Sequence, residues 1–349
     1  GNASLVPYSK IDAYLTNETL FKENGFDVTF SGDLRYLNQN EEVREPEQIG
    51  LDLLTLNLKA NYLKNTTGIF SEFGDIQIDQ SVNTLESVAR RGGKITLQHD
   101  DIFINTFSVL GKETFSFRDG VGITFDTDEN IVGVSGGVGL VQNKIVIQAL
   151  YILGSDQQNS YNSWAQGSPY DQGAQDGSYN SLSQDTGVSK GDVAGVILTT
   201  NLLNDKLFTE FEYDESDYDT NDSDEYSADR DKAYRLLFGG AYDIYTYDLV
   251  YEHFGPFYNV PGARGLRKDY EGVTATGYME HEIHSLNASL AGYHDNVDSD
   301  PYYSRVNSLY GTLGYKYYGF DSFILGFDYA KGADRSSDEP EEDLSLIHI

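Results

Sequence analysis

The feature of this sequence that most constrains its fold is a regular alternation of short and long connections between segments with a strand-like pattern. From Ile131 to Gly332, pairs of amphipathic segments are joined by a tight turn and then separated by a long polar stretch. The tight turns are Gln142-Asn143-Lys144, Asn204-Asp205, Asp243-Ile244, Ile283-His284 and Tyr318-Gly319. The long connections are residues 155–191, 217–231, 257–270, 296–303 and the acidic stretch from 333 onward. A β-sandwich has no reason to alternate loop length so regularly, so the pattern predicts an up-and-down arrangement of antiparallel strands.

The side chains within these segments alternate between an apolar and a polar face. Phe211 and Tyr213 share one face of a strand, whereas Glu210 and Glu212 share the other. A strand needs about 9–11 residues to cross a bilayer, and outer-membrane barrels join such strands by short turns on one side and longer loops on the other. The expected fold is therefore all-β, a transmembrane antiparallel up-and-down β-barrel.

Counting these segments predicts about 16 visible strands, and bacterial barrels of this type usually have an even strand number. Residues 131–332 supply ten of them, and the connections before residue 131 alternate less cleanly. The six strands predicted in that first part lie near 26–37, 51–63, 68–78, 92–99, 101–110 and 114–125.

Composition excludes several classes of protein. The 349 residues include 24 Lys and Arg against 56 Asp and Glu, a formal charge of −32, so the chain lacks the basic surface that nucleic acid requires. It has no cysteine, which excludes disulfides and thiolate metal sites. Its longest apolar stretch, near Ala149–Leu153, is far shorter than the ~20 residues of a spanning helix. The expected surroundings are outer-membrane lipid and lipopolysaccharide, in the cell outer membrane of a Gram-negative bacterium.

The two ends of the sequence suggest a truncated reading frame. Residue 1 is Gly, with no signal-peptide pattern after it. The last six residues, Leu344-Ser345-Leu346-Ile347-His348-Ile349, match the translation of a sequencing-library adapter. We therefore expect residues 1–343 to be a single barrel domain, truncated at both ends and incomplete, with 344–349 as a non-native tail. A short native apolar tail is the alternative.

The face opposite the apolar one carries an excess of carboxylates. Rings of carboxylates along a water-filled pore favour cations over anions, whereas charges near strand ends select nothing if they merely sit in solvent. The predicted pore-lining residues are the acids Asp27, Asp33, Glu210, Glu212, Asp248, Glu252, Glu280 and Asp328 and the bases Arg35, Lys59, Arg235 and Lys316.

Neither a resident cofactor nor a catalytic site is expected. The acidic loop 212–231 contains ten carboxylates and starts like a calcium-binding loop, but Asp222 and Ala228 occupy positions that need Gly and Glu. A solvated loop is favoured, with weak Ca²⁺ binding as the alternative. His281 and His284 should point to opposite faces of a strand, and no Gly-x-Ser-x-Gly elbow is present, so the chain is not expected to be an enzyme.

Two short passages resemble known barrels. Phe73-Gly74-Asp75-Ile76, followed by Arg90-Arg91-Gly92-Gly93, resembles the Gly-Asp…Arg-Gly pattern of large bacterial outer-membrane barrels, ushers and other export barrels among them. Phe254–Tyr258 followed by Asp269–Gly272 resembles a strand–loop–strand passage of similar barrels. Gly74 and Gly92 permit a close backbone approach. Asp75 and Arg91 are candidates for an ion pair in the lumen, although turn chemistry explains them equally well.

These observations predict a porin-like channel through which small hydrophilic solutes diffuse passively, with a preference for cations. The long loop around Tyr161–Val188 is the expected constriction. The alternatives are an export or assembly barrel, which the Gly-Asp…Arg-Gly resemblance implies, a surface adhesin or structural barrel, and a soluble extracellular β-protein.

Overall fold

The computed structural model describes residues 10–39, 50–112, 122–123, 126–157, 188–204, 206–220, 228–263, 265–320 and 322–336. These residues form β-strands joined by turns and irregular connections. In chain order the strands are β1 (Lys10–Glu23), β2 (Phe26–Gln39), β3 (Gly50–Lys64), β4 (Thr67–Ile78), β5 (Val88–His99), β6 (Ile102–Leu110), β7 (Asn130–Leu140), β8 (Ile145–Gln157), β9 (Val188–Leu202), β10 (Leu207–Asp219), β11 (Asp229–Tyr242), β12 (Tyr245–Phe254), β13 (Tyr270–His281), β14 (His284–His294), β15 (Val306–Tyr317) and β16 (Leu325–Ser336).

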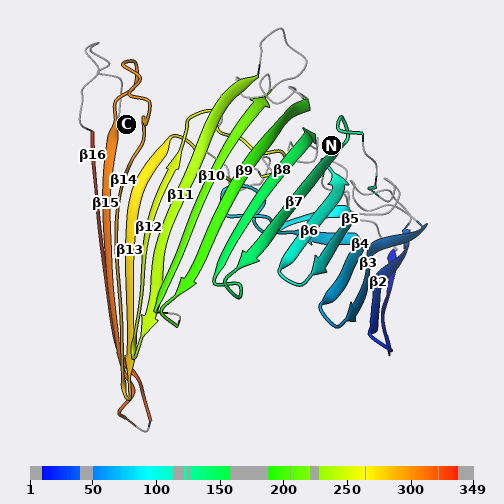
Figure 1. Ribbon diagram of the computed structural model, residues 1–349, viewed down its shortest axis with the longest axis horizontal. Helices are drawn as coiled ribbons and strands as arrows, with labels where there is room; N and C mark the ends of the chain where they lie inside the picture. Colours follow the sequence, from blue (N-terminus) through cyan, green and yellow to red (C-terminus); the bar gives the residue numbers. More distant parts are fainter. Residues whose placement is uncertain are drawn as a thin grey trace.

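All of these strands belong to one 16-stranded sheet whose spatial order is the order of the chain. Each strand pairs antiparallel with the next, so the topology is up-and-down throughout. Figure 1 shows the strands side by side as a strongly curved wall that ends at β16 on one side. Within the described residues β1 and β16 form the two edges, and the sheet is open between them.

Most of the short turns share one backbone conformation, a left-handed residue directly after the strand. Asn24, Asn65, Asp100 and Asp243 each have φ between 49° and 55° and lie directly after a strand. A two-residue hairpin with the twist of the flanking strands needs a left-handed residue, and Asn and Asp adopt that conformation most readily after Gly. The tight turns therefore form where the sequence places these residue types.

The alternation of connections extends over the whole sheet. The longer connections span residues 40–49, 79–87, 111–129, 158–187, 220–228, 255–269 and 295–305. Of these, 79–87 and 295–305 are described throughout and lie on the opposite side from the short turns. Figure 1 places the two kinds of connection at opposite ends of the strands. The expectation that the first 130 residues depart from this pattern is wrong, because the connections there are short and long in turn as well.

The predicted strand number is confirmed, although one strand was misplaced. β1 was not predicted, and its charged residues at both ends hide its amphipathic pattern. The strand predicted at 114–125 falls mainly outside the described residues, and the described residues 122–123 are not in a strand. β2 to β6 lie within a few residues of their predicted positions.

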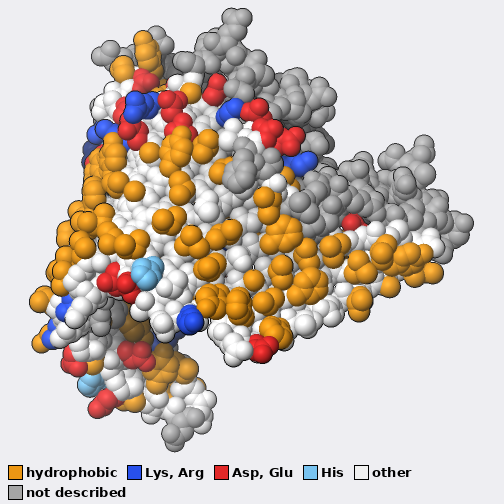
Figure 2. All heavy atoms as spheres, turned by 45° about the vertical axis from the view of Figure 1, so that its right-hand side comes forward, with side chains coloured by type: hydrophobic (Ala, Val, Ile, Leu, Met, Phe, Trp, Pro, Cys, Tyr) orange, Lys and Arg blue, Asp and Glu red, His pale blue; other side chains and the backbone are white. Residues whose placement is uncertain are grey.

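The convex outer face of the sheet is apolar. Phe238 on β11, Leu249 on β12 and Leu290 on β14 lie on this face and are about half exposed. Figure 2 shows hydrophobic side chains spread across one side of the molecule, with charged side chains gathered along its upper edge and at its lower end. Among the described residues there is no helix long and apolar enough to cross a membrane.

The buried core lies on the concave inner face, toward the end of the strands with the long connections. It is formed by side chains of β4, β6 to β9, β11 and β12 and by side chains from two connections that fold inward. The buried apolar residues of this cluster are Ile76, Ile78, Leu85, Phe107, Val109, Ile131, Leu150, Ile152, Val193, Ile197, Ala233, Phe254, Tyr258 and Val260.

Candidate functional site

A hairpin that leaves the sheet narrows the space on the concave inner side. β4 pairs with β3 only as far as Gly74, opposite Asn57, although β4 continues to Ile78. On the other side β5 pairs with β6 only from Gly92 onward. Beyond these points no strand of the described residues pairs with either side of the β4–β5 hairpin. Figure 1 shows these blue and cyan strands extending behind the green ones.

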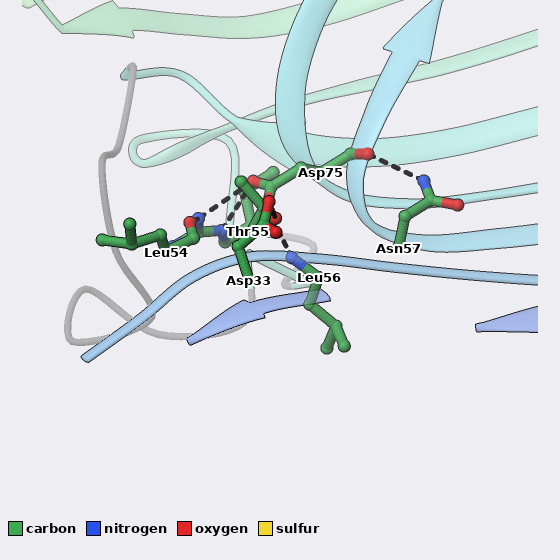
Figure 3. A network of polar contacts seen from close by, with 7 residues as sticks. Asp33, Leu54, Thr55, Leu56, Asn57 and Asp75 are labelled. Carbon is green, nitrogen blue, oxygen red and sulfur yellow. Dashed lines mark hydrogen bonds and ion pairs between the residues drawn. The ribbon is translucent and has the colours of Figure 1, made fainter. Parts of the chain in front are cut away.

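The gap that opens between β3 and β4 is closed by a side chain. The Leu56 amide donates to Asp75 Oδ2 at 2.9 Å, and the Asn57 side chain donates to the Asp75 carbonyl at 2.8 Å. Arg91 donates from Nε and Nη2 to Asp75 Oδ1 at 3.0 and 2.9 Å. Figure 3 shows the Asp75 carboxylate between the two strands at this point. The ion pair thus replaces part of the backbone ladder between β3 and β4.

Two glycines let the hairpin turn away at this position. Gly74 and Gly92 lie directly opposite each other in the β4–β5 ladder. Gly74 has a φ of +105°, and a Cβ there would lie 2.0 Å from the Leu56 carbonyl oxygen. A Cβ at Gly92 would lie 2.1 Å from the Ser108 carbonyl oxygen. Both positions therefore need glycine, since any side chain would collide with the backbone of the neighbouring strand.

We call residues 79–87, at the tip of this hairpin, the first inward segment. Leu85 in this segment and Ile78, the last residue of β4, are 1% exposed and pack into the core cluster. The cluster also contains Ile152 and Val193 from the inner faces of β8 and β9, on the opposite side of the curved sheet. Burying one such side chain stabilises a fold by about 1.5–3 kcal/mol, so apolar packing holds the segment inside the sheet.

Residues 255–269 between β12 and β13 form the second inward segment. Tyr258 and Val260 belong to the same core cluster, and Ala263 and Leu266 pack against it. The Gly262 carbonyl accepts a hydrogen bond from Arg90 Nη2 at 3.4 Å, which joins the segment to the β4–β5 hairpin. The two inward segments therefore form one packed unit on the inner face.

A polar contact fixes the tip of the first inward segment to the wall. The Asn83 amide donates to Glu212 Oε1 at 3.3 Å, and the Asn83 side chain donates to Asp214 Oδ2 at 3.0 Å. Glu212 and Asp214 lie on the inner face of β10 and are 1% and 0% exposed. The Tyr258 hydroxyl donates to the Asn83 carbonyl at 3.0 Å. The sequence prediction counted Glu212 as exposed to the pore, whereas the first inward segment covers it.

Tyr258 is a stable donor in this contact. Burial, and next the nearby carboxylates of Asp214 and Glu212, raise the pKa of the Tyr258 hydroxyl well above its ordinary value. The phenol therefore keeps its proton over the whole physiological range. Its hydrogen bond ties the second inward segment to the first.

The strand register places the whole predicted pore-lining set on the inner face. Glu212 lies opposite Arg235, which lies opposite Glu252, and the other members follow from the same ladders. The set comprises Asp27, Asp33, Arg35, Lys59, Glu210, Glu212, Arg235, Asp248, Glu252, Glu280, Lys316 and Asp328.

Several of these charges are paired along the wall. Arg235 forms ion pairs with Glu210 and, at 3.5 Å, with Glu252, whose other oxygen lies 3.8 Å from Arg267. Lys59 lies 3.4 Å from Glu72 on the same face. By contrast, the structure shows no ion pair for Asp248, Glu280 or Asp328 among the residues it describes, and all three are exposed.

Next to the edge strand β1, Arg35 and Asp33 of β2 also have hydrogen-bond partners. Arg35 donates to both carboxylate oxygens of Asp12 at 2.9 and 2.8 Å. Asp33 accepts hydrogen bonds from Thr16 and Thr55, both at 2.7 Å. This part of the wall therefore presents bonded pairs instead of isolated charges.

Other sequence predictions had different outcomes. The expected constriction around Tyr161–Val188 lies almost wholly outside the described residues. In the acidic loop 212–231, residues up to Asp219 continue β10, and the described residues contain no cluster of metal-ligating side chains. The prediction that His281 and His284 point to opposite faces is wrong, because a turn at Glu282–Ile283 places them directly opposite each other in the β13–β14 ladder.

The inward segments were missed by the sequence analysis. Segment 255–269 carries Pro256 and Pro261 and the apolar residues Tyr258 and Val260, a composition that is unusual for an exposed polar loop. Segment 79–87 gives a weaker signal, since Leu85 is its only large apolar residue. Apolar residues within a long connection were the available indication of burial.

Sixteen up-and-down antiparallel strands with an apolar outer face and inward-folded connections define an outer-membrane porin-type fold. Comparison with solved structures agrees. Pseudomonas aeruginosa OccK2 (OpdF) aligns over 93% of this chain and 87% of its own, with a TM-score of 0.50 and 8% identity. Pseudomonas aeruginosa OpdL aligns over 93% and 91%, with a TM-score of 0.50 and 8% identity.

A BenF-like porin from Pseudomonas fluorescens Pf-5 is also similar, over 95% of this chain and 87% of its own, with a TM-score of 0.49 and 8% identity. No protein-family model and no curated protein sequence matches the chain. Sequence identity this low shows a shared fold. It says nothing of individual side chains.

Proposed function

We propose that this chain forms the wall of a passive channel for small hydrophilic solutes in the outer membrane of a Gram-negative bacterium. The observation that carries the proposal is the docking of two chain segments on the inner face of a sheet whose outer face is apolar. An apolar outer face suits lipid, and a charged inner face suits water. The inward segments narrow the passage beside β6 to β12, while inner-face residues such as Thr276 and Thr312 stay exposed.

The wall charge supports a preference for cations. Asp248, Glu280 and Asp328 lie on the inner face, and no basic side chain pairs with them in the part of the chain that the structure describes. Exposed carboxylates along an aqueous passage attract cations and repel anions. Glu210 and Glu252 contribute less, because Arg235 occupies their oxygens.

Conductance in planar lipid bilayers tests this proposal. The purified chain should insert as steady channels, and its reversal potential in a KCl gradient should have the sign of a cation-preferring pore. Absence of channels, together with no heat-dependent shift in migration on SDS gels, would overturn the membrane assignment. Channels with no ion preference would overturn only the role of the carboxylates.

A further inference from the structure

Three tyrosines form a row on the inner face beside the inward segments. Tyr270, Tyr293 and Tyr310 come from the adjacent strands β13, β14 and β15. The ring centroids of Tyr270 and Tyr293 are 5.2 Å apart, and those of Tyr293 and Tyr310 are 5.8 Å apart with planes within 6°. Tyr270 lies opposite the buried Phe254, so the row starts at the edge of the core cluster.

Glycines set the rings close against the wall. A Cβ at Gly332 on β16 would lie 2.4 Å from Tyr310 Cε1. A Cβ at Gly272 on β13 would lie 2.5 Å from Tyr293 Cβ and 2.9 Å from the Tyr270 hydroxyl. The Tyr310 ring, the Tyr293 Cβ and the Tyr270 hydroxyl thus occupy space that only glycine leaves free. A ring that lies against the wall turns its other side to the interior, and Tyr310 is 39% exposed.

Charged groups with opposite hydrogen-bonding roles lie at the two ends of the row. The Arg267 guanidinium lies over the Tyr270 ring, 4.8 Å from its centroid, and its side chain is 63% exposed. At the other end the Tyr310 hydroxyl donates to the Asp334 carboxylate at 3.1 and 3.2 Å. The row therefore combines apolar ring faces with a donor at one end and an acceptor at the other.

We infer that this tyrosine row is a binding track for pyranose rings, which makes saccharides a solute class of the proposed channel and so rests on the proposed function. A pyranose has an apolar face of C–H groups and an edge of hydroxyls. The apolar face packs on aromatic rings, and the hydroxyls bond to Arg267, Asp334 and the tyrosine hydroxyls. An aliphatic solute would use the ring faces and leave the charged groups without partners.

Solute-induced block of the ion current tests the inference. Maltotriose should reduce the current through single channels in a concentration-dependent way, whereas sorbitol, a polyol without a ring, should not at the same concentration. Removing one ring by Tyr293→Leu or Tyr310→Leu should weaken maltotriose binding about two- to tenfold, the range expected for one aromatic contact. Tyr293→Phe, which keeps the ring, should bind nearly as well as the unmodified chain.

Tyr329→Leu is the matched control, because Tyr329 lies on the outer face of β16 opposite Leu313 of β15. This change should leave the sugar block unaltered. Channels that conduct normally but ignore maltotriose would overturn the inference and leave the proposed function standing. Block by gluconate, an acyclic hydroxy acid, but not by maltotriose would also overturn it, because the charge of Arg267 alone would then explain binding.

Calorimetry keeps the test independent of conductance. Titration of maltotriose into the detergent-solubilised protein should release or absorb heat with a measurable affinity that Tyr293→Leu weakens. Absence of binding heat would overturn the track even if no channel current were observed. Full retention of binding by both Tyr293→Leu and Tyr310→Leu would overturn it as well.

Discussion

Asp75 and Arg91 meet across the β4–β5 ladder, where both Nε and Nη2 of the guanidinium donate to a single carboxylate oxygen. The second oxygen accepts the backbone amide of Leu56 on β3. The Asp75 carboxylate of β4 thus bonds both to β3, from which the hairpin departs, and to β5, the other strand of the hairpin. The entry to the inward segments depends on this contact.

Replacing Arg91 should loosen that junction. Arg91 is 2% exposed, and Arg91→Met would remove the charged partner of the Asp75 carboxylate, whose side chain is 33% exposed. Hydrogen bonds to charged groups contribute about 1.5–3 kcal/mol, and we expect the free energy of unfolding to fall by about that amount. Urea unfolding in lipid vesicles measures it. A double-mutant cycle with Asp75→Asn should give a coupling free energy, and simple additivity would contradict the pairing.

Gly74 offers a sharper backbone test. Gly74→Ala would place Cβ against the Leu56 carbonyl in a left-handed conformation, so we expect a loss of about 1–3 kcal/mol in unfolding free energy. Gly277→Ala is the control, because a Cβ there meets nothing within 4 Å. The control should change stability little or raise it slightly. Equal effects of the two substitutions would show that clearance at Gly74 is unimportant.

The strand pattern could be read from the sequence because side chains on a strand alternate and Asn or Asp marks many of the turns. Phe211 and Glu210 reveal their faces without any knowledge of their neighbours. The departure of β4 from β3 could not be read in this way. Ile76 and Ile78 continue the alternation as though the strand stayed in the sheet, and only the contacts made by Gly74 and Asp75 show that it leaves.

A change at Asn83 should release the first inward segment. Asn83→Asp removes the donor to Asp214 and adds a third carboxylate beside Glu212 and Asp214 in a buried site. An additional carboxyl group is costly to bury where water is excluded, because its charged form loses its solvation. Single-channel conductance should rise as the passage widens. Asn287→Asp on the exposed inner face of β14 is the control and should not widen the passage. Unchanged conductance in Asn83→Asp would mean that the segment does not limit it.

Neutralising exposed wall carboxylates should reduce cation preference. Asp248→Asn combined with Glu280→Gln removes two inner-face acids that form no ion pair within the described part of the chain. The reversal potential in a KCl gradient should shift toward zero. Asp243→Asn, in the β11–β12 turn, removes one carboxylate away from the wall, and asparagine tolerates its φ of 55°. A shift in the control as large as in the double variant would argue against selection at the wall.

Tyr258 predicts an alkaline signature. The folded state raises the pKa of its hydroxyl, whereas the unfolded chain loses this proton above about pH 10. The unfolded state then binds fewer protons than the folded one, so stability falls as pH rises, by up to about 1.4 kcal/mol per unit. At pH 8, Tyr258→Phe should cost about 0.5–1.5 kcal/mol for the lost hydrogen bond to Asn83. This deficit should shrink when unfolding midpoints are compared at pH 11, and a deficit independent of pH would contradict the buried phenol.

For the inner wall, the face of each charged residue was predictable and its bonding was not. Alternation is enough to place Glu210, Glu212 and Glu252 on one side of the sheet. It cannot show that Arg235 pairs with the first and third, or that Asn83 covers the second, since Asn83 lies far away in the chain. Such contacts depend on which connections fold inward.

The glycines behind the tyrosine row influence which solutes the wall binds, although no solute touches these glycines. A methyl group at Gly332 would meet the ring of Tyr310, and one at Gly272 would meet the Cβ of Tyr293, so either would displace a tyrosine of the row. The shape offered to a passing molecule would change while each tyrosine kept its identity. Substitution of the glycines behind the aromatic rings can therefore change the selectivity of such a wall without any change in the residues that contact the solute.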